Sequence, residues 1–158
     1  MEKCLEPTSA FAILEHSLFF EEFTLSNKCL ELIEDYTLEA FHSSAFMDIS
    51  QDTLAFVLES DHLDIDELEL FKLCCKWGEP KSNQRKDNVS LREIIGKAVF
   101  NIRFPVMSAE DFTNIVRPTE VLTGEEKASV YAYLDVPEEK NKPPMFSIRK
   151  RKRCRLKE

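Results

Sequence analysis

The segment DIDELELFKLCCKWG, residues 64–78, indicates the fold class of the chain. Asp64 and Glu67 stand three positions apart, the spacing of a capping box, in which two side chains bond the free N–H groups of a first helical turn. Three residues that follow recur at helical spacing: Leu70, Cys74 and Trp77. The cap and the apolar stripe together predict a helix to about Gly78 that buries one face.

Similar signals repeat outward from this segment. Three further pairs combine a cap residue with an acid three positions on: Ser90 with Glu93, Ser108 with Asp111, and Thr123 with Glu126. Apolar residues also recur at helical spacing upstream, in residues 10–18, 25–33 and 54–58, with a short element at 38–41. The polar segment 79–88 contains Pro80 and is expected to be a surface loop. The pattern predicts a string of short helices that pack antiparallel across short connections.

Length and composition agree with an all-α fold. A chain of 158 residues can bury a sizeable core without disulfides or metal. With 3 Gly, 43% hydrophobic and 32% charged residues, the composition suits charged helices better than a turn-rich sheet protein. No segment alternates as a strand does. Prolines and dense charge follow Val136, so we expect a helical domain over residues 1–136 and a basic linker or disordered tail over 137–158.

The cysteines and the N-terminus bear on the compartment. Five cysteines, whose only close pair is adjacent in sequence, indicate a reduced, intracellular protein rather than a disulfide framework. The first residues lack the basic start and apolar run of a signal peptide, and no segment approaches the roughly 20 apolar residues that span a bilayer. We expect a soluble cytoplasmic protein, with the nucleus as an alternative location.

Charge is divided unevenly along the chain. Residues 1–139 contain 12 Lys+Arg and 28 Asp+Glu, a net charge of −16, whereas residues 140–158 contain 9 and 1, a net charge of +8. An acidic domain repels phosphate backbones, so we do not expect the folded part to bind nucleic acid. The basic run matches a charged linker, a nuclear-import signal, or a segment that binds nucleic acid or a membrane surface. It includes Arg149, Lys150, Arg151, Lys152 and Arg153.

No set of residues suited to catalysis can be assembled. The histidines are isolated from one another and from cysteines at metal-ligand spacing. The acidic run 61–69 lacks the glycine and ligand spacing of an EF-hand, and no nucleophile motif or Gly-rich phosphate loop occurs. Cys74 shares the apolar stripe, so at least one of Cys74 and Cys75 is a core residue. We expect no enzyme activity, no catalytic residue, no cofactor and no metal.

An ordered set of local motifs runs through about 110 residues of the chain. The set comprises FMDI at 46–49, LESDHLDI at 58–65, Trp77, and IRFP at 102–105 followed by Met107 and Ser108. It resembles the BACK domain of BTB-BACK proteins. Further segments resemble the subgroup in which a PHR-type β-sandwich follows BACK: LEPTSAFAILEHSLFFEE at 5–22, Val121–Thr123, and FSIRKRKR at 146–153.

The resemblance implies a non-catalytic adaptor of a cullin-3 RING ubiquitin ligase, a part of the ubiquitin conjugation pathway. In that family a BTB domain dimerises and makes most of the cullin-3 contact, while the first BACK helices complete the cullin groove as a three-box. A C-terminal domain binds the protein substrate, and BACK sets its distance from the cullin. Residues resembling BTB or PHR are not found in this sequence, so we expect a fragment or short product that is a monomer. The alternative function is a small nuclear polyanion-binding protein acting through the basic tail.

Apolar residues crowd the end of the first expected helix. One short helix end cannot bury them all in one direction, so some apolar surface there should face a partner. The resemblance implies a three-box-like helix pair at 10–36 and two candidate partners: an adjacent BTB domain, or an extended cullin-3 N-terminal segment laid between BTB and BACK. The candidate partner-binding residues are Leu14, Leu18, Phe19, Phe20 and Phe23.

Overall fold

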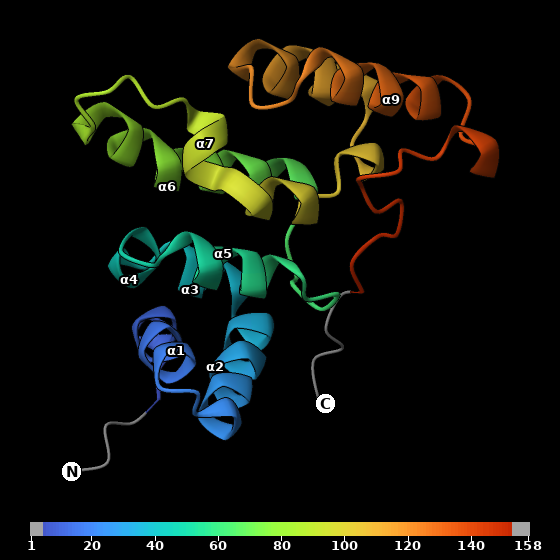
Figure 1. Cartoon of the computed structure of the whole chain (residues 1–158). Coiled ribbons are helices and arrows are strands. Elements are labelled where there is room, and N and C mark those ends of the chain that lie inside the picture. Colours follow the sequence, from blue (N-terminus) through green and yellow to red (C-terminus); the bar gives the residue numbers. More distant parts are fainter. Residues whose placement is uncertain (1–4, 153–158) are drawn as a thin grey trace. The chain divides into compact units, whose positions relative to one another are not determined.

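The structure is a computed structural model that describes residues 5–152. The chain divides into two compact units (Figure 1). The first unit runs to Ile65 and also takes in the chain from Arg151 on, and the second comprises Asp66–Lys150. All regular elements in the described part of the chain are helices, which confirms the expected all-α class.

The first unit is built around a pair of helices at its N-terminus. Its helices are α1 (Ala10–Phe19), α2 (Phe23–Asp35), α3 (Thr37–Phe41), α4 (Ser44–Met47) and α5 (Gln51–Leu58). α1 lies beside α2 and also contacts α4 and α5 (Figure 1). Phe11 of α1 packs on Phe41 and Phe46 with ring centroids 5.1 and 5.2 Å away. These buried rings explain why α3 and α4, each a single turn, remain helical: tertiary packing stabilises them more than helix propensity does.

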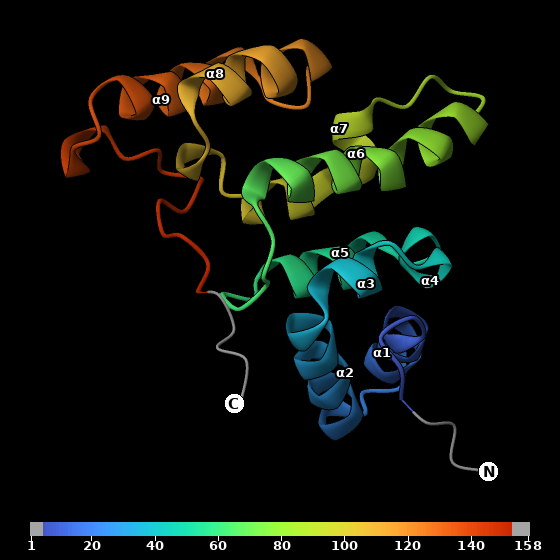
Figure 2. The same cartoon turned by 180° about the vertical axis from the view of Figure 1, so that it is seen from behind.

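The second unit contains the longest helix of the described chain. Its α-helices are α6 (Glu67–Gln84), α7 (Leu91–Ile95), α8 (Ala109–Asp111) and α9 (Gly124–Asp135). Figure 2 shows α8 and α9 next to each other and α7 against α6. Shorter 3-10 and π turns complete the unit: Gly96–Asn101, Phe104–Val106, Phe112–Val116, Arg117–Thr119 and Glu139–Asn141. Phe104 is central to its core, with the rings of Phe71 and Phe146 at 5.6 and 5.2 Å.

Two of the predicted capping boxes are confirmed. Ser90 and Glu93 cap α7 reciprocally, and Thr123 and Glu126 do the same for α9. The Ser108 hydroxyl accepts a hydrogen bond from the Asp111 backbone N–H at 3.1 Å, so α8 also begins where the sequence predicts. These caps depend only on residues three positions apart, which is why the sequence reveals them.

The predicted capping box of Asp64 and Glu67 is wrong. α6 begins at Glu67, after an N-cap residue, Asp66, whose side chain makes no cap hydrogen bond. Glu67 is only 4% exposed, and its carboxylate accepts a hydrogen bond from the backbone N–H of Arg103 at 3.0 Å. The carboxylate therefore satisfies a buried donor elsewhere in the second unit, which a local pattern does not reveal.

The predicted loop at residues 79–88 is also partly wrong, because α6 continues to Gln84 through Pro80. A proline removes one backbone donor, and here the carbonyl left without it belongs to Lys76, an exposed residue that water can reach. The Lys81 ammonium donates to the Trp77 carbonyl at 3.1 Å, which satisfies another group of this last part of the helix.

The helix that begins at the Ser90 and Glu93 cap ends early, at Gly96. Gly96 has a φ of 55°, a conformation in the left-handed region that glycine adopts without steric cost. α7 therefore stops at Ile95, and the chain continues as a 3-10 helix to Asn101.

Part of the expected tail, residues 137–152, lies within the described residues. In this segment Phe146 is 3% exposed and contacts Phe100 as well as Phe104 in the second unit. The segment therefore includes a packed aromatic anchor. Residues 153–158 lie outside the described residues.

Candidate partner-binding surface

α1 ends in a tight turn with the hydrogen bonds of a Schellman motif. The Glu22 N–H donates to the Ser17 carbonyl at 2.8 Å, and the Glu21 N–H donates to the Leu18 carbonyl at 3.3 Å. Glu21 has a φ of 57°, at the position where most such turns place glycine. α2 begins two residues later, so the end of α1 and the start of α2 present their side chains close together.

A buried pair of hydroxyls joins the two helices behind this turn. Ser17 and Ser26 lie 2.8 Å apart in a shared hydrogen bond, and both are almost fully buried. Each hydroxyl also lies within hydrogen-bond distance of a backbone carbonyl, that of Leu14 for Ser17 and that of Glu22 for Ser26. Because each hydroxyl has one proton, one of them donates to its carbonyl while the other donates to its hydroxyl partner. The pair holds α1 and α2 in one register, because any slide of one helix would leave a buried hydroxyl with fewer partners.

Three phenylalanines at this turn are exposed to solvent. Phe19 is 81% exposed, and Phe20 and Phe23 are each 66% exposed. The rings of Phe19 and Phe20 pack edge to face, with centroids 5.1 Å apart. The other phenylalanines of the chain are buried or half-buried. Burying such a side chain contributes about 1.5–3 kcal/mol, so three rings left in water at one turn form an unusual apolar surface.

We call Leu18, Phe19, Phe20 and Phe23 the aromatic surface. Leu18 is half-buried and lies at its base. Leu14, which the sequence grouped with these residues, is fully buried in the core of the first unit. Leu14 can therefore support the aromatic surface from beneath, but its side chain does not reach solvent.

Two hollows flank the aromatic surface within the first unit. One, of about 290 Å³, is lined by Glu15, Leu18, Phe19, Ser50, Asp52, Thr53 and Phe56. The other, of about 510 Å³ and more open, is lined by Glu21, Glu22, Phe23, Thr24, Leu25 and Lys28. Each hollow thus combines one exposed phenylalanine with two carboxylates. These carboxylates were not predicted from the sequence, in which the acid pair directly after Phe20 is the one signal for them.

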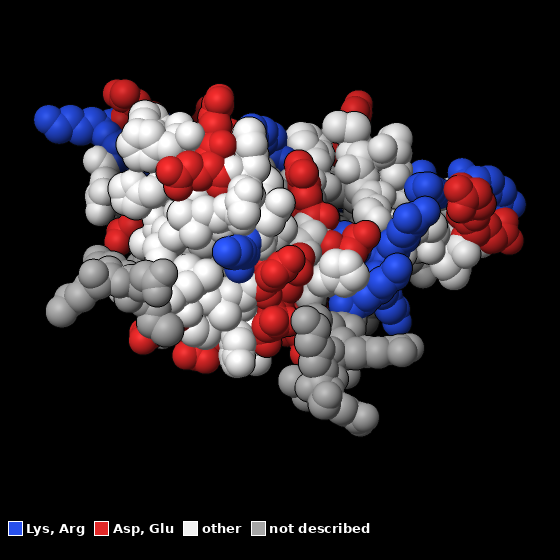
Figure 3. All heavy atoms as spheres, turned by 90° about the horizontal axis from the view of Figure 1, so that it is seen from below, with Lys and Arg blue, Asp and Glu red and all other residues white. Residues whose placement is uncertain are grey.

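The charges around the aromatic surface are mostly negative. Residues 5–65 contain one Lys, no Arg and thirteen Asp or Glu, a net charge of −12. Figure 3, a view from the side of α1 and α2, shows uncharged surface bordered by acidic side chains. Of the carboxylates in the hollows, Glu15 is engaged by the Ser50 N–H and hydroxyl at 3.1 and 3.2 Å.

The basic tail is held against the first unit at the end of α5. Arg151 donates from its guanidinium to the carbonyl of Leu58 at 2.8 Å and to that of Ser60, and the Lys152 N–H donates to the Asp61 carbonyl at 2.6 Å. A cation at the C-terminal end of a helix satisfies free carbonyls and complements the helix dipole. No local pattern could have revealed this contact.

The other described residues of the predicted basic tail have side chains exposed to solvent. Arg149 and Lys150 are exposed, and the Arg149 carbonyl accepts a hydrogen bond from the Arg103 guanidinium at 3.1 Å. Lys152 is exposed as well. Arg153 lies outside the described residues.

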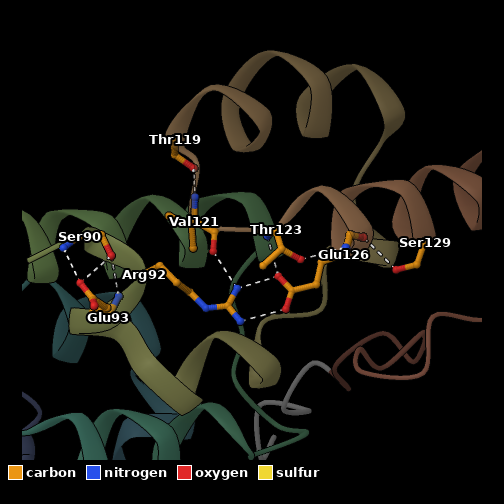
Figure 4. Close-up of polar contacts among 8 residues, drawn as sticks. All are labelled: Ser90, Arg92, Glu93, Thr119, Val121, Thr123, Glu126 and Ser129. Atoms are coloured by element: carbon orange, nitrogen blue, oxygen red, sulfur yellow. Dashed lines mark hydrogen bonds and ion pairs between the residues drawn. The ribbon is translucent and has the colours of Figure 1, made fainter.

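A partly buried ion pair between Arg92 and Glu126 has a structural role in the second unit. The Arg92 guanidinium donates to both carboxylate oxygens of Glu126, at 2.7 and 2.9 Å, and to the Val121 carbonyl at 2.8 Å (Figure 4). Glu126 in turn accepts from the Thr123 N–H. The hydrogen bonds from Arg92 hold the pKa of the Glu126 carboxyl below its ordinary value. Since these groups satisfy one another, they join α7 to α9 and leave no reactive group.

Possible metal ligands and the cysteines were the remaining candidates for chemistry in the described residues. Between residues 5 and 152 no group of three or more His, Cys, Asp or Glu could hold a metal ion. Cys74 and Cys75 are both buried, as the apolar stripe indicated for at least one of them. Burial, together with the nearby Glu79 charge, raises the pKa of the Cys75 thiol to about 12, so this cysteine is a poor nucleophile. Among the described helices, none is long and apolar enough to cross a membrane.

Comparison with known proteins assigns the fold to a family. The sequence profile of the family described as BACK, BTB And C-terminal Kelch, matches residues 10–117. BTB/POZ domain-containing protein 6-B of Danio rerio is 31% identical over 96% of this chain and 32% of its own length. Human BTB/POZ domain-containing protein 6 is 29% identical over 96% of this chain, and human BTB/POZ domain-containing protein 3 is 30% identical over 84%. No solved structure matches the chain significantly.

The profile match covers more than half of the chain, and the chain belongs to the BACK family. Over most of its length it is similar to BTB/POZ domain-containing proteins. The resemblance drawn from the sequence motifs is thereby confirmed, while its finer assignment to the PHR subgroup stays a prediction. The chain spans about a third of the length of the curated relatives that it matches.

Proposed function

We propose that this chain is a non-catalytic module of a BTB-type adaptor for a cullin-3 RING ubiquitin ligase. In this proposal the aromatic surface binds a protein partner, and the helices set the spacing and orientation of a substrate-binding domain relative to the cullin. The observation that carries it is the exposure of Phe19, Phe20 and Phe23 at one turn. No chemistry is required of the module, because proximity and orientation alone can accelerate transfer to a bound substrate.

The geometry behind the surface favours binding. The Schellman turn and the Ser17–Ser26 hydrogen bond hold the end of α1 and the start of α2 in one arrangement. A preorganised surface loses little conformational entropy when a partner binds. Exposed aromatic side chains at the centre of such a surface are the usual source of most of the binding energy.

Two partners fit the proposal, and cullin-3 is the one to test directly. An extended cullin-3 N-terminal segment would lay apolar side chains against Phe19 and Phe20, and an adjacent BTB domain would cover the same surface. In the family that the sequence resembles, the BTB domain supplies most of the cullin contact. Binding of cullin-3 by this chain alone should therefore be weak.

The first experiment is isothermal titration of the whole chain with a cullin-3 N-terminal domain that retains its extended first segment. Phe19→Ala and Phe20→Ala should each weaken binding by about tenfold or more, the size of an interface hot-spot loss. Tyr36→Ala is the matched control: Tyr36 is 51% exposed in the same unit but lies at the other end of α2, and its removal should leave binding unchanged.

Absence of heat at high protein concentration would rule out an independent cullin contact. Equal weakening by Phe19→Ala and Tyr36→Ala would rule out the aromatic surface as its location. Circular dichroism of each variant shows whether it remains folded, so that lost binding is not confused with unfolding.

A second candidate function, polyanion binding by the basic tail, is favoured by the exposure of Arg149, Lys150 and Lys152. It predicts salt-sensitive binding to heparin that survives Phe19→Ala and is lost when residues 147–158 are removed. Each lost phosphate or sulfate contact should also reduce the salt dependence of binding. Heparin binding that persists without residues 147–158 would exclude this function.

A further inference from the structure

We infer that the aromatic surface takes a protein segment in which an apolar anchor stands beside lysine or arginine side chains. This inference rests on the proposed function and deepens it, because it names the chemistry of the partner. The residues that select the cationic side chains are Glu21, Glu22 and Asp52, which border the exposed phenylalanines.

Charge complementarity carries the first step. The part of the first unit from residue 5 to residue 65 has a net charge of −12, and its single basic residue is Lys28. Lys28 lines the Phe23 hollow, where Glu21 and Glu22 still leave a negative balance. A field of one sign over a binding surface attracts partners of the other sign and repels partners of the same sign.

The positions of the carboxylates carry the second step. Glu21 and Glu22 are exposed, and within the described residues neither side chain makes a hydrogen bond or an ion pair. Asp52 is exposed in the hollow of Phe19. A cationic side chain of the partner can therefore meet a carboxylate while its neighbouring apolar residue covers a phenylalanine ring.

The aromatic rings themselves add to the preference for a cation. The faces of exposed phenylalanines attract lysine and arginine groups through the ring quadrupole. A neutral apolar segment would instead remove water from the carboxylates without offering hydrogen bonds in its place, which weakens binding. An acidic segment would meet like charges at both hollows.

The test uses fluorescein-labelled peptides and the whole chain, with binding followed by fluorescence anisotropy. One peptide has leucine anchors flanked by lysines; the matched peptide has glutamine in place of every lysine. We expect saturable binding of the lysine peptide at about 0.05 M NaCl, weakened several-fold at about 0.5 M NaCl, where charges are screened within a few ångströms. The glutamine peptide should bind at least about tenfold more weakly.

Two variants locate the effect. Glu21→Gln combined with Glu22→Gln should weaken binding of the lysine peptide by about fivefold, the sum of two exposed ion pairs, and leave the glutamine peptide unaffected. The matched control, Glu39→Gln with Glu59→Gln, removes the same charge from exposed positions of the first unit that line neither hollow, and should change binding less than twofold. Phe23→Ala should weaken both peptides.

Each outcome is decisive. Equal binding of the lysine and glutamine peptides, or equal loss in the two double variants, would overturn the inference. Binding of the cullin-3 domain that weakens with Phe19→Ala but not with Glu21→Gln and Glu22→Gln would leave the proposed function intact and overturn only the partner chemistry. Binding of the lysine peptide without any cullin-3 binding would contradict the proposed function and support the surface chemistry alone.

Discussion

Glu21 holds a backbone conformation that most residues avoid. Its φ of 57° lies in the left-handed region, where a Cβ approaches the following carbonyl. Glycine relieves that contact, yet the position holds a glutamate whose carboxylate borders the Phe23 hollow. The left-handed backbone at this position costs stability, and under the proposed function the Glu21 side chain serves the binding surface.

Glu21→Gly is expected to stabilise the chain by about 1 kcal/mol, because the turn keeps its hydrogen bonds and loses its steric strain. Urea unfolding followed by circular dichroism measures the difference. Glu21→Ala is the control, since alanine keeps the Cβ and should bring no such gain. A similar gain from both variants would show that the strain is not the cause.

The Arg92–Glu126 pair gives the second unit a defined dependence on pH. Because Arg92 holds the pKa of Glu126 below its ordinary value, the carboxylate stabilises the folded state at any pH above the unfolded pKa of about 4.3. That contribution is lost as the pH falls through the lower folded pKa. Wild type should therefore lose more unfolding free energy between pH 6 and pH 3, roughly, than Glu126→Gln does.

The measurement is a series of urea titrations across that range. Glu39→Gln is a suitable control, because Glu39 is an exposed carboxylate of the first unit. It should leave the pH dependence of the wild type in place. Identical pH dependence in wild type and Glu126→Gln would show that the pair contributes nothing to folding.

At the level of the elements, a glycine sets how closely α6 and α7 approach. A Cβ added at Gly78 would lie 2.6 Å from the Leu91 Cδ1 atom and 3.5 Å from the Ile94 Cγ2 atom. The shorter distance requires the end of the Leu91 side chain to move, whereas the longer one is an ordinary van der Waals contact. The sequence pattern predicted that the helix ends at about this glycine, whereas Gly78 lies inside α6 at the point where α7 packs.

Gly78→Val is expected to destabilise the chain by about 1–3 kcal/mol, the usual cost of overpacking a closely packed contact. Gly124→Val is the matched control, because a Cβ at Gly124 meets nothing within 4 Å. Its effect should stay within about 0.5 kcal/mol. Thermal unfolding of both variants makes the comparison, and equal losses would contradict the close approach of α6 and α7 as the cause.

Considered over the described chain, two groups of phenylalanines in the first unit contrast in exposure, one in the core and one in water. Phe11, Phe41 and Phe46 fill the core of the first unit with at most 1% exposure. Phe19, Phe20 and Phe23 in the same unit remain in water. The aromatic surface thus lies outside the core of the first unit, and under the proposed function its apolar character serves binding.

This contrast predicts that the same substitution, Phe to Ala, reduces the unfolding free energy much more in the core than at the surface. Phe46→Ala should reduce the unfolding free energy by about 3–5 kcal/mol, because it opens a cavity in the core. Phe19→Ala should change it by less than about 0.5 kcal/mol. Urea unfolding tests both. A large loss from Phe19→Ala would mean that this ring belongs to the packing of the unit rather than to a binding surface.

Local pattern was enough for several features of this protein. The helical class, the caps at Ser90 and Thr123 and the crowding of apolar residues at 18–23 were all predictable, since each depends on residues within a few positions of one another. Family membership was predictable too, because its motifs are short and occur in order. The burial of Leu14 was not predictable, since only the packed structure shows that its side chain faces the core.

Other features depended on partners far away in the chain. Glu67 bonds a backbone group 36 residues on, and Arg151 reaches the end of α5 across 93 residues. Phe146 is buried on Phe104 although its surroundings in the sequence are charged. The sequence determined the helices and the polar and aromatic side chains that they carry. Only the tertiary structure decided which of these side chains pair, because a buried donor or ring packs against the complementary group nearest to it in space.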